Sequence, residues 1–210
     1  MTTTTASLTL EEYLAYDDGT DNRYELVDGK LVNMPPESDR NNLIALFLLS
    51  ELMKLVDLKL IRHKDTEIVV TGNRTRVRIP DLMILTEDLL AAIGGKRATI
   101  TADMPSPALV VEVVSPGKAN EDRDYRYKRC SAVLGVSPMS DCIKKRSEYA
   151  ARGILEYWIV DPQNSKITIL SLVDGLYEES IFESEQTITS KVVPQFSQTA
   201  ADILCISENF

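Results

Sequence analysis

The stretch "ALVVEVVSPG", Ala108–Gly117, decides the fold expected for this chain. Its apolar, largely β-branched residues form an almost unbroken run that a Ser-Pro-Gly sequence ends. Such a run is typical of a central strand that is buried on both faces of a sheet. Glu112 is the one charged residue within it. Because a buried carboxylate is costly unless it is paired or binds a metal, Glu112 marks a candidate site.

A second acidic residue stands at the start of another apolar run, "RIPDLMIL", where Asp81 follows Pro80. If the two strands pair, Asp81 and Glu112 form a site with two carboxylates. Such a site binds magnesium and leaves positions for water and a phosphate. A nearby cation would stabilise the charge that develops on the phosphate. Two structural alternatives stay open, namely a turn aspartate at Asp81 and an ion pair between Glu112 and Arg78.

Helices and strands alternate around these two runs, and this alternation predicts an α/β fold with a mixed central sheet flanked by helices. The sequence favours a first helix with Ser7 as N-cap and a hairpin turn at Asp28-Gly29. A buried helix is expected over 42–56. Further strands are expected over 58–72, 74–85 and 155–162, the first two separated by a turn at Gly72-Asn73, with more in the C-terminal part.

Length and composition limit the classes of protein. A chain of 210 residues is most simply a single domain, 1–210. The longest apolar stretch, over 43–50, is too short to cross a membrane, and no signal peptide is recognisable. Three cysteines without metal-binding spacing fit a cytoplasmic location. The net charge of -9 disfavours broad attraction to nucleic acid, so any such function requires a local basic patch or a metal.

Five motifs occur in a fixed order, roughly from Leu8 to Ser171: "YELVDGKLV", "RIPDLMIL", "LVVEVVSPG", "DRDYRYK" and "RGILEYWIVDP". Together they resemble the Uma-type restriction endonucleases of the PD-(D/E)XK nuclease superfamily. The resemblance implies a restriction-endonuclease-like fold and hydrolysis of DNA with Mg²⁺, for which Mn²⁺ can substitute. It further implies a homodimer. By this resemblance Asp81 and Glu112 are metal ligands, and Glu25 is an additional acidic residue, although its place before a hairpin turn also fits a structural role.

The chain departs from the superfamily pattern at the lysine. Two residues after Glu112 stands Val114 rather than lysine. The resemblance instead implies a lysine from the following helix, with a tyrosine four residues later. Lys128 fits the first part of this pattern, but Ala132 occupies the tyrosine position.

The pattern resumes at Lys145, which precedes Tyr149 by four residues. Removing Cys130 to Arg146 restores the whole pattern, so we infer an insertion over 130–146. Two lysines therefore compete for one role. We favour Lys128, because a short loop ties it to the strand of Glu112, whereas Lys145 keeps its spacing to Tyr149 and the following strand.

The sequence thus indicates a magnesium-dependent endonuclease in which a water attacks the phosphorus and Lys128 or Lys145 orients that water or neutralises the phosphate. Two other hypotheses remain. The first is a catalytically degenerate relative that binds nucleic acid or a protein partner without cleavage. The second is a metal-dependent hydrolase of small phosphoesters. Cleavage of plasmid DNA is expected only of the endonuclease, so a plasmid assay separates the endonuclease from the other two hypotheses.

Overall fold

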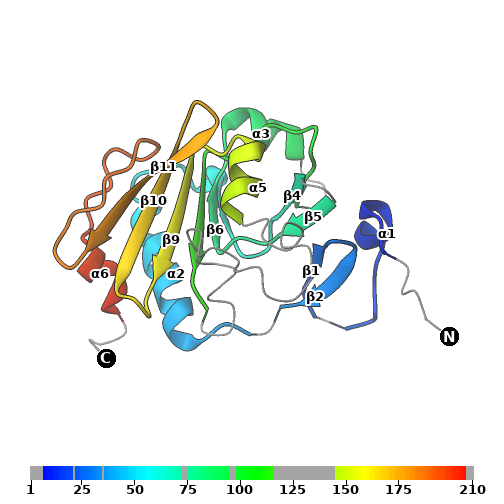
Figure 1. Ribbon diagram of the computed structural model, residues 1–210, viewed down its shortest axis with the longest axis horizontal. Coiled ribbons are helices and arrows are strands. Elements are labelled where there is room, and N and C mark those ends of the chain that lie inside the picture. Colours follow the sequence, from blue (N-terminus) through cyan, green and yellow to red (C-terminus); the bar gives the residue numbers. More distant parts are fainter. Residues whose placement is uncertain are drawn as a thin grey trace, which may run out of the picture.

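Two mixed β-sheets form the framework of the computed structural model (Figure 1). The structure describes residues 7–20, 22–34, 36–71, 75–94, 98–115 and 145–206. Helices lie against both sheets, so the predicted mixed α/β class is confirmed. The expected strands divide between two sheets, whereas the sequence suggested one central sheet. None of the helices in the described ranges is long and apolar enough to cross a membrane.

The larger sheet has the strand order β11-β10-β9-β8-β6-β3. Its strands are β3 (Ile61–His63), β6 (Leu82–Ile84), β8 (Leu109–Val113), β9 (Glu156–Asp161), β10 (Lys166–Val173) and β11 (Leu176–Glu183). β8 pairs with β6 in antiparallel and with β9 in parallel orientation, and all its residues are buried. The prediction that this run is a central strand is therefore confirmed.

The smaller sheet has the strand order β2-β1-β5-β4-β7. Its strands are β1 (Tyr24–Val27), β2 (Lys30–Asn33), β4 (Glu67–Thr71), β5 (Thr75–Arg78) and β7 (Thr99–Ile100). Asp28 and Gly29 join β1 to β2 with φ angles of 52° and 79°, as a tight hairpin requires. The predicted hairpin is confirmed, whereas the predicted turn at Gly72-Asn73 lies outside the described residues.

The chain changes sheets at Pro80. The sequence "RTRVRIPDLMIL" reads as one strand, but β5 ends at Arg78 in the smaller sheet and β6 begins at Leu82 in the larger one. Proline offers no backbone N–H to a sheet, which is consistent with a break at this point. As a consequence Asp81 lies at the entrance to β6, between the two sheets.

The helices are α1 (Leu10–Leu14), α2 (Asp39–Leu52), α3 (Glu87–Ile93), α5 (Lys145–Arg152) and α6 (Ala200–Leu204), with a 3-10 turn over Leu58–Leu60. Thr9 caps α1 instead of Ser7, because Thr9 and Glu12 form a reciprocal capping box. α2 begins earlier than predicted, since the Ser38 hydroxyl accepts from the Asn41 amide. The expected end of the interrupted helix at Gly153 is confirmed by its φ of 81°.

Two apolar clusters lie on opposite faces of the larger sheet. One cluster joins α2 and α6 to side chains such as Val111 and Val113. The other joins α3, α5 and the smaller sheet to side chains such as Val110 and Val114. Because side chains alternate along a strand, Glu112 points to the face that α5 covers. Figure 1 shows α5 between β9–β11 and the smaller sheet.

Candidate active site

Strand register brings the two predicted carboxylates together. β6 and β8 pair with Leu82 opposite Val111 and Met83 opposite Val110. Continued by one position, this register places Asp81 opposite Glu112. Residues that stand opposite each other in an antiparallel pair point to the same face of the sheet. Asp81 and Glu112 thus point to the same face of the sheet, the one that α5 covers, as expected if the two strands pair.

Glu112 is held by two donors from α5. The Lys145 Nζ donates to Glu112 Oε2 at 2.8 Å, and the Tyr149 hydroxyl donates to Glu112 Oε1 at 2.8 Å. Lys145 and Tyr149 are four residues apart, so they lie on the same side of the helix. Both side chains are buried. Burial and the charge of Glu112 raise the pKa of Tyr149 well above its usual value, so its hydroxyl remains a donor.

Asp81 has a different environment. Its Oδ2 accepts from the Val113 backbone N–H at 2.7 Å, and its Oδ1 lies 3.9 Å from the Lys64 Nζ. Burial raises the pKa of Asp81 to about 6, and the neighbouring Glu37 carboxylate adds to this rise. The Val113 hydrogen bond and the ammonium groups of Lys64 and Lys145 lower the pKa only in part. The positive charge around Asp81 is therefore insufficient to offset its burial.

An open cleft of about 790 Å³ gives access to this carboxylate, and its lining includes Asp81, Lys64 and Glu37. Glu37 is oriented by the Ser115 hydroxyl, which donates to Glu37 Oε2 at 3.0 Å. The Asn41 amide of α2 donates to the same oxygen at 3.1 Å. Residues that follow β8 and begin α2 therefore fix a third carboxylate at the cleft.

Lys64 belongs to the site, although sequence reasoning missed it. It occupies the turn between β3 and β4 with a φ of 59°, a region that residues other than glycine seldom adopt. Its backbone N–H donates to the Asp81 carbonyl at 3.1 Å, and its ammonium group donates to the Asn42 side chain. The sequence offers no signal for this turn conformation, which directs Lys64 to the cleft.

Glu25 lies in a buried network of charges. Arg78 donates to Glu25 Oε2 at 3.1 Å and to Glu148 Oε2 at 2.9 Å, and the Ile79 amide donates to Glu25 Oε1 at 3.2 Å. Arg76 also binds Glu148. Burial lowers the pKa of Arg78, but Glu25 and Glu148 outweigh this effect and raise it overall. Arg78 thus pairs with Glu25 and Glu148, whereas Glu112 binds Lys145 and Tyr149.

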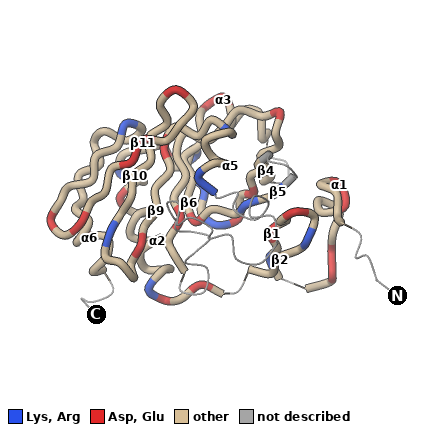
Figure 2. The backbone as a smooth tube through the Cα atoms, in the orientation of Figure 1, with Lys and Arg blue, Asp and Glu red and all other residues tan. Residues whose placement is uncertain are grey.

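The charges at the cleft indicate whether a divalent cation fits. The carboxylates of Asp81 and Glu37 and the cations Arg23 and Lys64 line the cleft, and Glu112 is paired with Lys145. These charges balance one another, so the site has no excess positive charge with which to hold a phosphodiester anion. A divalent cation would supply that positive charge. Acidic and basic residues are interspersed along the described chain (Figure 2).

The donor set is small. Within the described part of the chain, no three His, Cys, Asp or Glu side chains form a group that could hold a metal by themselves. Magnesium commonly needs only one or two protein carboxylates, because water and substrate phosphate supply the remaining oxygens. Asp81 and Glu112 therefore fit magnesium in the presence of a phosphate ligand.

The structure describes one of the two competing lysines. Lys145 contacts Glu112, whereas Lys128 lies outside the described residues. Of the predicted insertion over 130–146, only Lys145 and Arg146 are described. The contact of Lys145 depends on its spacing to Tyr149, which was the sequence argument in its favour.

The chain is similar to known proteins in sequence and in fold. The sequence model of the Uma2 family, described as "Putative restriction endonuclease", matches residues 10–202. A crystal structure from Anabaena variabilis ATCC 29413, described as a putative nuclease belonging to DUF820, is similar with a TM-score of 0.65. That pair shares 14% sequence identity over 95% of this chain and 98% of the other. No curated protein matches this chain. The structural similarity supports the expected fold.

Proposed function

The chain belongs to the Uma2 family, and from this membership we propose that it is a magnesium-dependent endonuclease that hydrolyses DNA phosphodiester bonds. The observation that carries the proposal is the pair of carboxylates, Asp81 and Glu112, on one face of the sheet with Lys145 bound to Glu112. Two carboxylates and a lysine are the residue types that this chemistry needs.

Asp81 and Glu112 would hold the metal. Magnesium at this position would polarise a phosphate oxygen and lower the pKa of a water, which are the two effects that favour hydrolysis. The Val113 N–H fixes Asp81 Oδ2, and Tyr149 fixes Glu112 Oε1, so both carboxylates are oriented in advance. Such orientation lowers the reorganisation required during the reaction.

Two ammonium groups would act on the phosphate. We assign the principal role to Lys145 rather than to Lys128, because Lys145 already contacts Glu112. Its charge would stabilise the negative charge that develops on the phosphate oxygens. Lys64 would neutralise a further phosphate oxygen from the β3–β4 turn. Glu25 would act indirectly, because Arg78 connects it to Glu148 in α5, the helix of Lys145.

The test is cleavage of supercoiled plasmid with Mg²⁺ or Mn²⁺. Asp81→Ala and Glu112→Ala should abolish cleavage, and Lys145→Ala should reduce it about 10²–10³-fold. Glu178→Ala, at an exposed position of β11, is the matched control and should cleave as the unmodified protein does. Linear product without accumulated nicked circles would support a homodimer that cuts both strands.

Absence of cleavage by the well-folded, unmodified protein would contradict the proposal. The hypothesis of a degenerate, binding-only relative would then take its place. Hydrolysis of a chromogenic phosphodiester with intact plasmid would instead favour a small-molecule substrate.

A further inference from the structure

A second pocket adjoins the cleft. It has a volume of about 320 Å³, and Tyr13, Tyr16 and Tyr24 line it. Asn22, Arg23, Lys64 and Ile79 line both this pocket and the cleft of Asp81. The two hollows are therefore neighbours, and the second lies beside the cleft that gives access to Asp81. We call this second hollow the tyrosine pocket.

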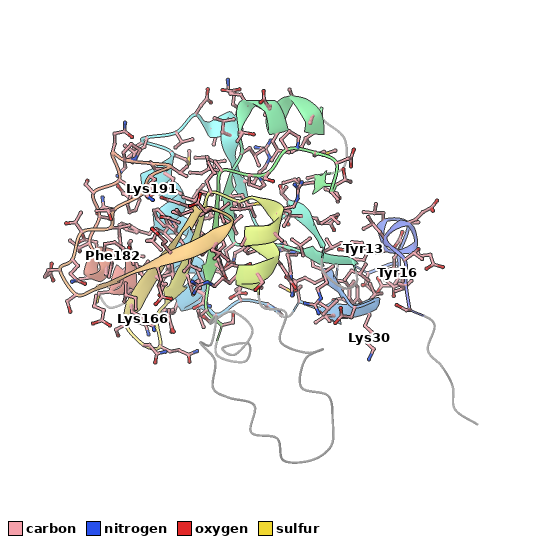
Figure 3. The ribbon with its side chains drawn as sticks, turned by 45° about the horizontal axis from the view of Figure 1, so that its top comes forward. Tyr13, Tyr16, Lys30, Lys166, Phe182 and Lys191 are labelled. Atoms are coloured by element: carbon pink, nitrogen blue, oxygen red, sulfur yellow. The ribbon has the colours of Figure 1, made fainter. Side chains whose placement is uncertain are left out.

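The tyrosines of this pocket differ in how far their side chains are exposed to solvent. Tyr13 is 4% exposed, and its single hydroxyl proton is shared between the Tyr24 carbonyl at 2.7 Å and Glu67 Oε1 at 2.9 Å. Tyr16 is 42% exposed and meets Tyr24 edge to face, with ring centroids 5.7 Å apart. Tyr13 and Tyr16 lie together at α1 in Figure 3. Tyr13 thus provides a fixed wall, and Tyr16 an accessible ring.

Cations stand at the boundary between the two hollows. The Arg23 Nη1 donates to Asp65 Oδ1 at 2.8 Å and to the Lys64 carbonyl at 3.4 Å. The side chains of Arg23 and Lys64 line both hollows and bring positive charge to the boundary between them. Asn22, which lines both, carries an amide that can donate and accept toward a base edge.

The walls of the tyrosine pocket also include acidic groups. Asp65 and Glu67 line it, and Asp18 accepts from the Tyr24 hydroxyl at 2.7 Å. These carboxylates repel a phosphate from the pocket but tolerate a neutral ring. Aromatic rings beside a phosphate site favour stacking with nucleobases, and every base offers a face for such stacking.

We propose that the tyrosine pocket binds an unpaired nucleobase next to the phosphate that is cleaved, with Tyr16 as the stacking ring. This inference rests on the proposed function for the identity of that phosphate. A paired base is enclosed in its duplex and cannot enter such a pocket unless it flips out. The preferred substrate is therefore single-stranded or locally unpaired nucleic acid.

Binding without metal tests the inference separately from cleavage. The probe is a short single-stranded deoxyoligonucleotide with fluorescein at one end and one 2-aminopurine, compared with its duplex and with the matching oligoribonucleotide. The single strand should bind more tightly than the duplex, and 2-aminopurine fluorescence should fall on binding. Tyr16→Ala should weaken single-strand binding about tenfold and remove the fluorescence change. Tyr16→Phe, which retains the ring, should bind within about twofold of the unmodified protein.

Unchanged single-strand binding by Tyr16→Ala would overturn the inference, as would equal binding of duplex and single strand. Tyr16→Leu, which keeps apolar bulk without a ring, replaces Tyr16→Ala if that variant fails to fold. Tighter ribonucleotide binding that still depends on Tyr16 would support the pocket and identify RNA as the source of the base. Plasmid cleavage with binding that does not depend on Tyr16 would leave the endonuclease proposal standing alone. Single-strand binding that depends on Tyr16, without any plasmid cleavage, would support the tyrosine pocket and contradict the endonuclease proposal.

Discussion

At the scale of single residues, the two carboxylates of the site have opposite properties. Glu112 is oriented and neutralised by Lys145 and Tyr149 before any ligand binds. Asp81 is buried next to Glu37, and the Lys64 ammonium nitrogen lies 3.9 Å from its Oδ1. Its raised pKa shows that the folded protein disfavours its charge. The ionised Asp81 carboxylate thus lowers the free energy of unfolding unless a cation binds to it. A metal ion that binds there would relieve this cost and would bind more tightly as a result.

Asp81→Asn should stabilise the protein without metal at pH 7.5. Raising a carboxyl pKa from 3.8 to about 6 costs the folded state about 3 kcal/mol once the group is ionised. The folded state binds this proton more tightly than the unfolded state, so stability falls as pH rises from about 4 to about 6. Asparagine keeps an acceptor for the Val113 N–H. Urea unfolding at pH 4 and pH 7.5 measures the effect.

The gain from Asp81→Asn should nearly disappear at pH 4, where the aspartate is protonated in the folded state. Added Mg²⁺ should stabilise the unmodified protein at pH 7.5 but not the variant. If the difference in unfolding free energy between Asp81→Asn and the unmodified protein is the same at pH 4 and pH 7.5, the charge of Asp81 is compensated by other groups.

Glu112 and Lys145 should show strong coupling in a double-mutant cycle. Removing one partner of a buried ion pair leaves the other unpaired and typically costs about 3–5 kcal/mol. Glu112→Gln and Lys145→Met should each destabilise by an amount of this order, and the double variant should be more stable than the sum predicts. Urea unfolding of all four proteins provides the coupling free energy.

The exposed pair Arg23–Asp65 is the matched control, with 53% and 80% of its side chains exposed. Its coupling should stay below about 1 kcal/mol. Coupling of the same small size between Glu112 and Lys145 would contradict the contact on which the assignment of Lys145 depends.

The sequence identified Asp81, Glu112 and Lys145 because each stands in a recognisable pattern. It could not assign partners to buried charges. Arg78 was considered for Glu112, but it pairs with Glu25 across 53 residues and with Glu148 across 70. Lys64 carries no pattern, since its position follows from a backbone conformation with positive φ. Pairing over such distances depends on three-dimensional packing, which a single sequence does not specify.

At the scale of elements, α5 is the part that completes the site. It is only eight residues long, and its charged residue Glu148 is buried between Arg76 and Arg78 of β5. A helix this short is unstable alone and depends on tertiary contacts. The arginines thus fix α5 against the smaller sheet while Lys145 and Tyr149 bind the larger one. The site forms where the two sheets are connected.

Glu148→Ala should therefore lower both stability and cleavage, although Glu148 touches no substrate in the proposal. Leaving two buried arginines without this partner should cost about 3–5 kcal/mol. Because Lys145 would lose its fixed position, kcat should fall more than KM rises. Thermal unfolding and steady-state cleavage measure the two effects. The exposed Glu178→Ala should change stability by less than about 0.5 kcal/mol, and an equal loss in both variants would argue against a positioning role.

The elements with strong local signals were predicted well. The hairpin at Asp28-Gly29 and the apolar strand β8 follow from turn chemistry and side-chain pattern. β5 and β6 were read as one strand, because the sheet change at Pro80 depends on what each half packs against. The strands expected in the C-terminal part are confirmed as β10 and β11, whereas the helices α3 and α6 were not predicted. Both depend mainly on the core they cover.

At the scale of the whole molecule, the net charge of -9 limits how nucleic acid can bind. Affinity for DNA depends on salt through the number of phosphates that cations contact. Arg23 and Lys64 line both hollows, and Lys145 is the cation paired with Glu112. With two or three such contacts, affinity should fall roughly 10- to 50-fold for a duplex and roughly 7- to 20-fold for a single strand between about 50 and 200 mM salt. Fluorescence polarisation at several salt concentrations measures the slope, and a fall of 10³-fold would reveal further phosphate contacts.

The backbone N–H of Val113 provides a means of observing the site directly. It lies in a central strand, yet it donates to the Asp81 side chain rather than to a neighbouring strand. The exchange rate and the NMR chemical shift of its amide proton should therefore depend on whether the Asp81 carboxylate is protonated or bound to a metal. The amide of Val114, which donates to the Val160 carbonyl, reports the sheet itself. Comparing these two adjacent signals separates events at the carboxylate from opening of the strand.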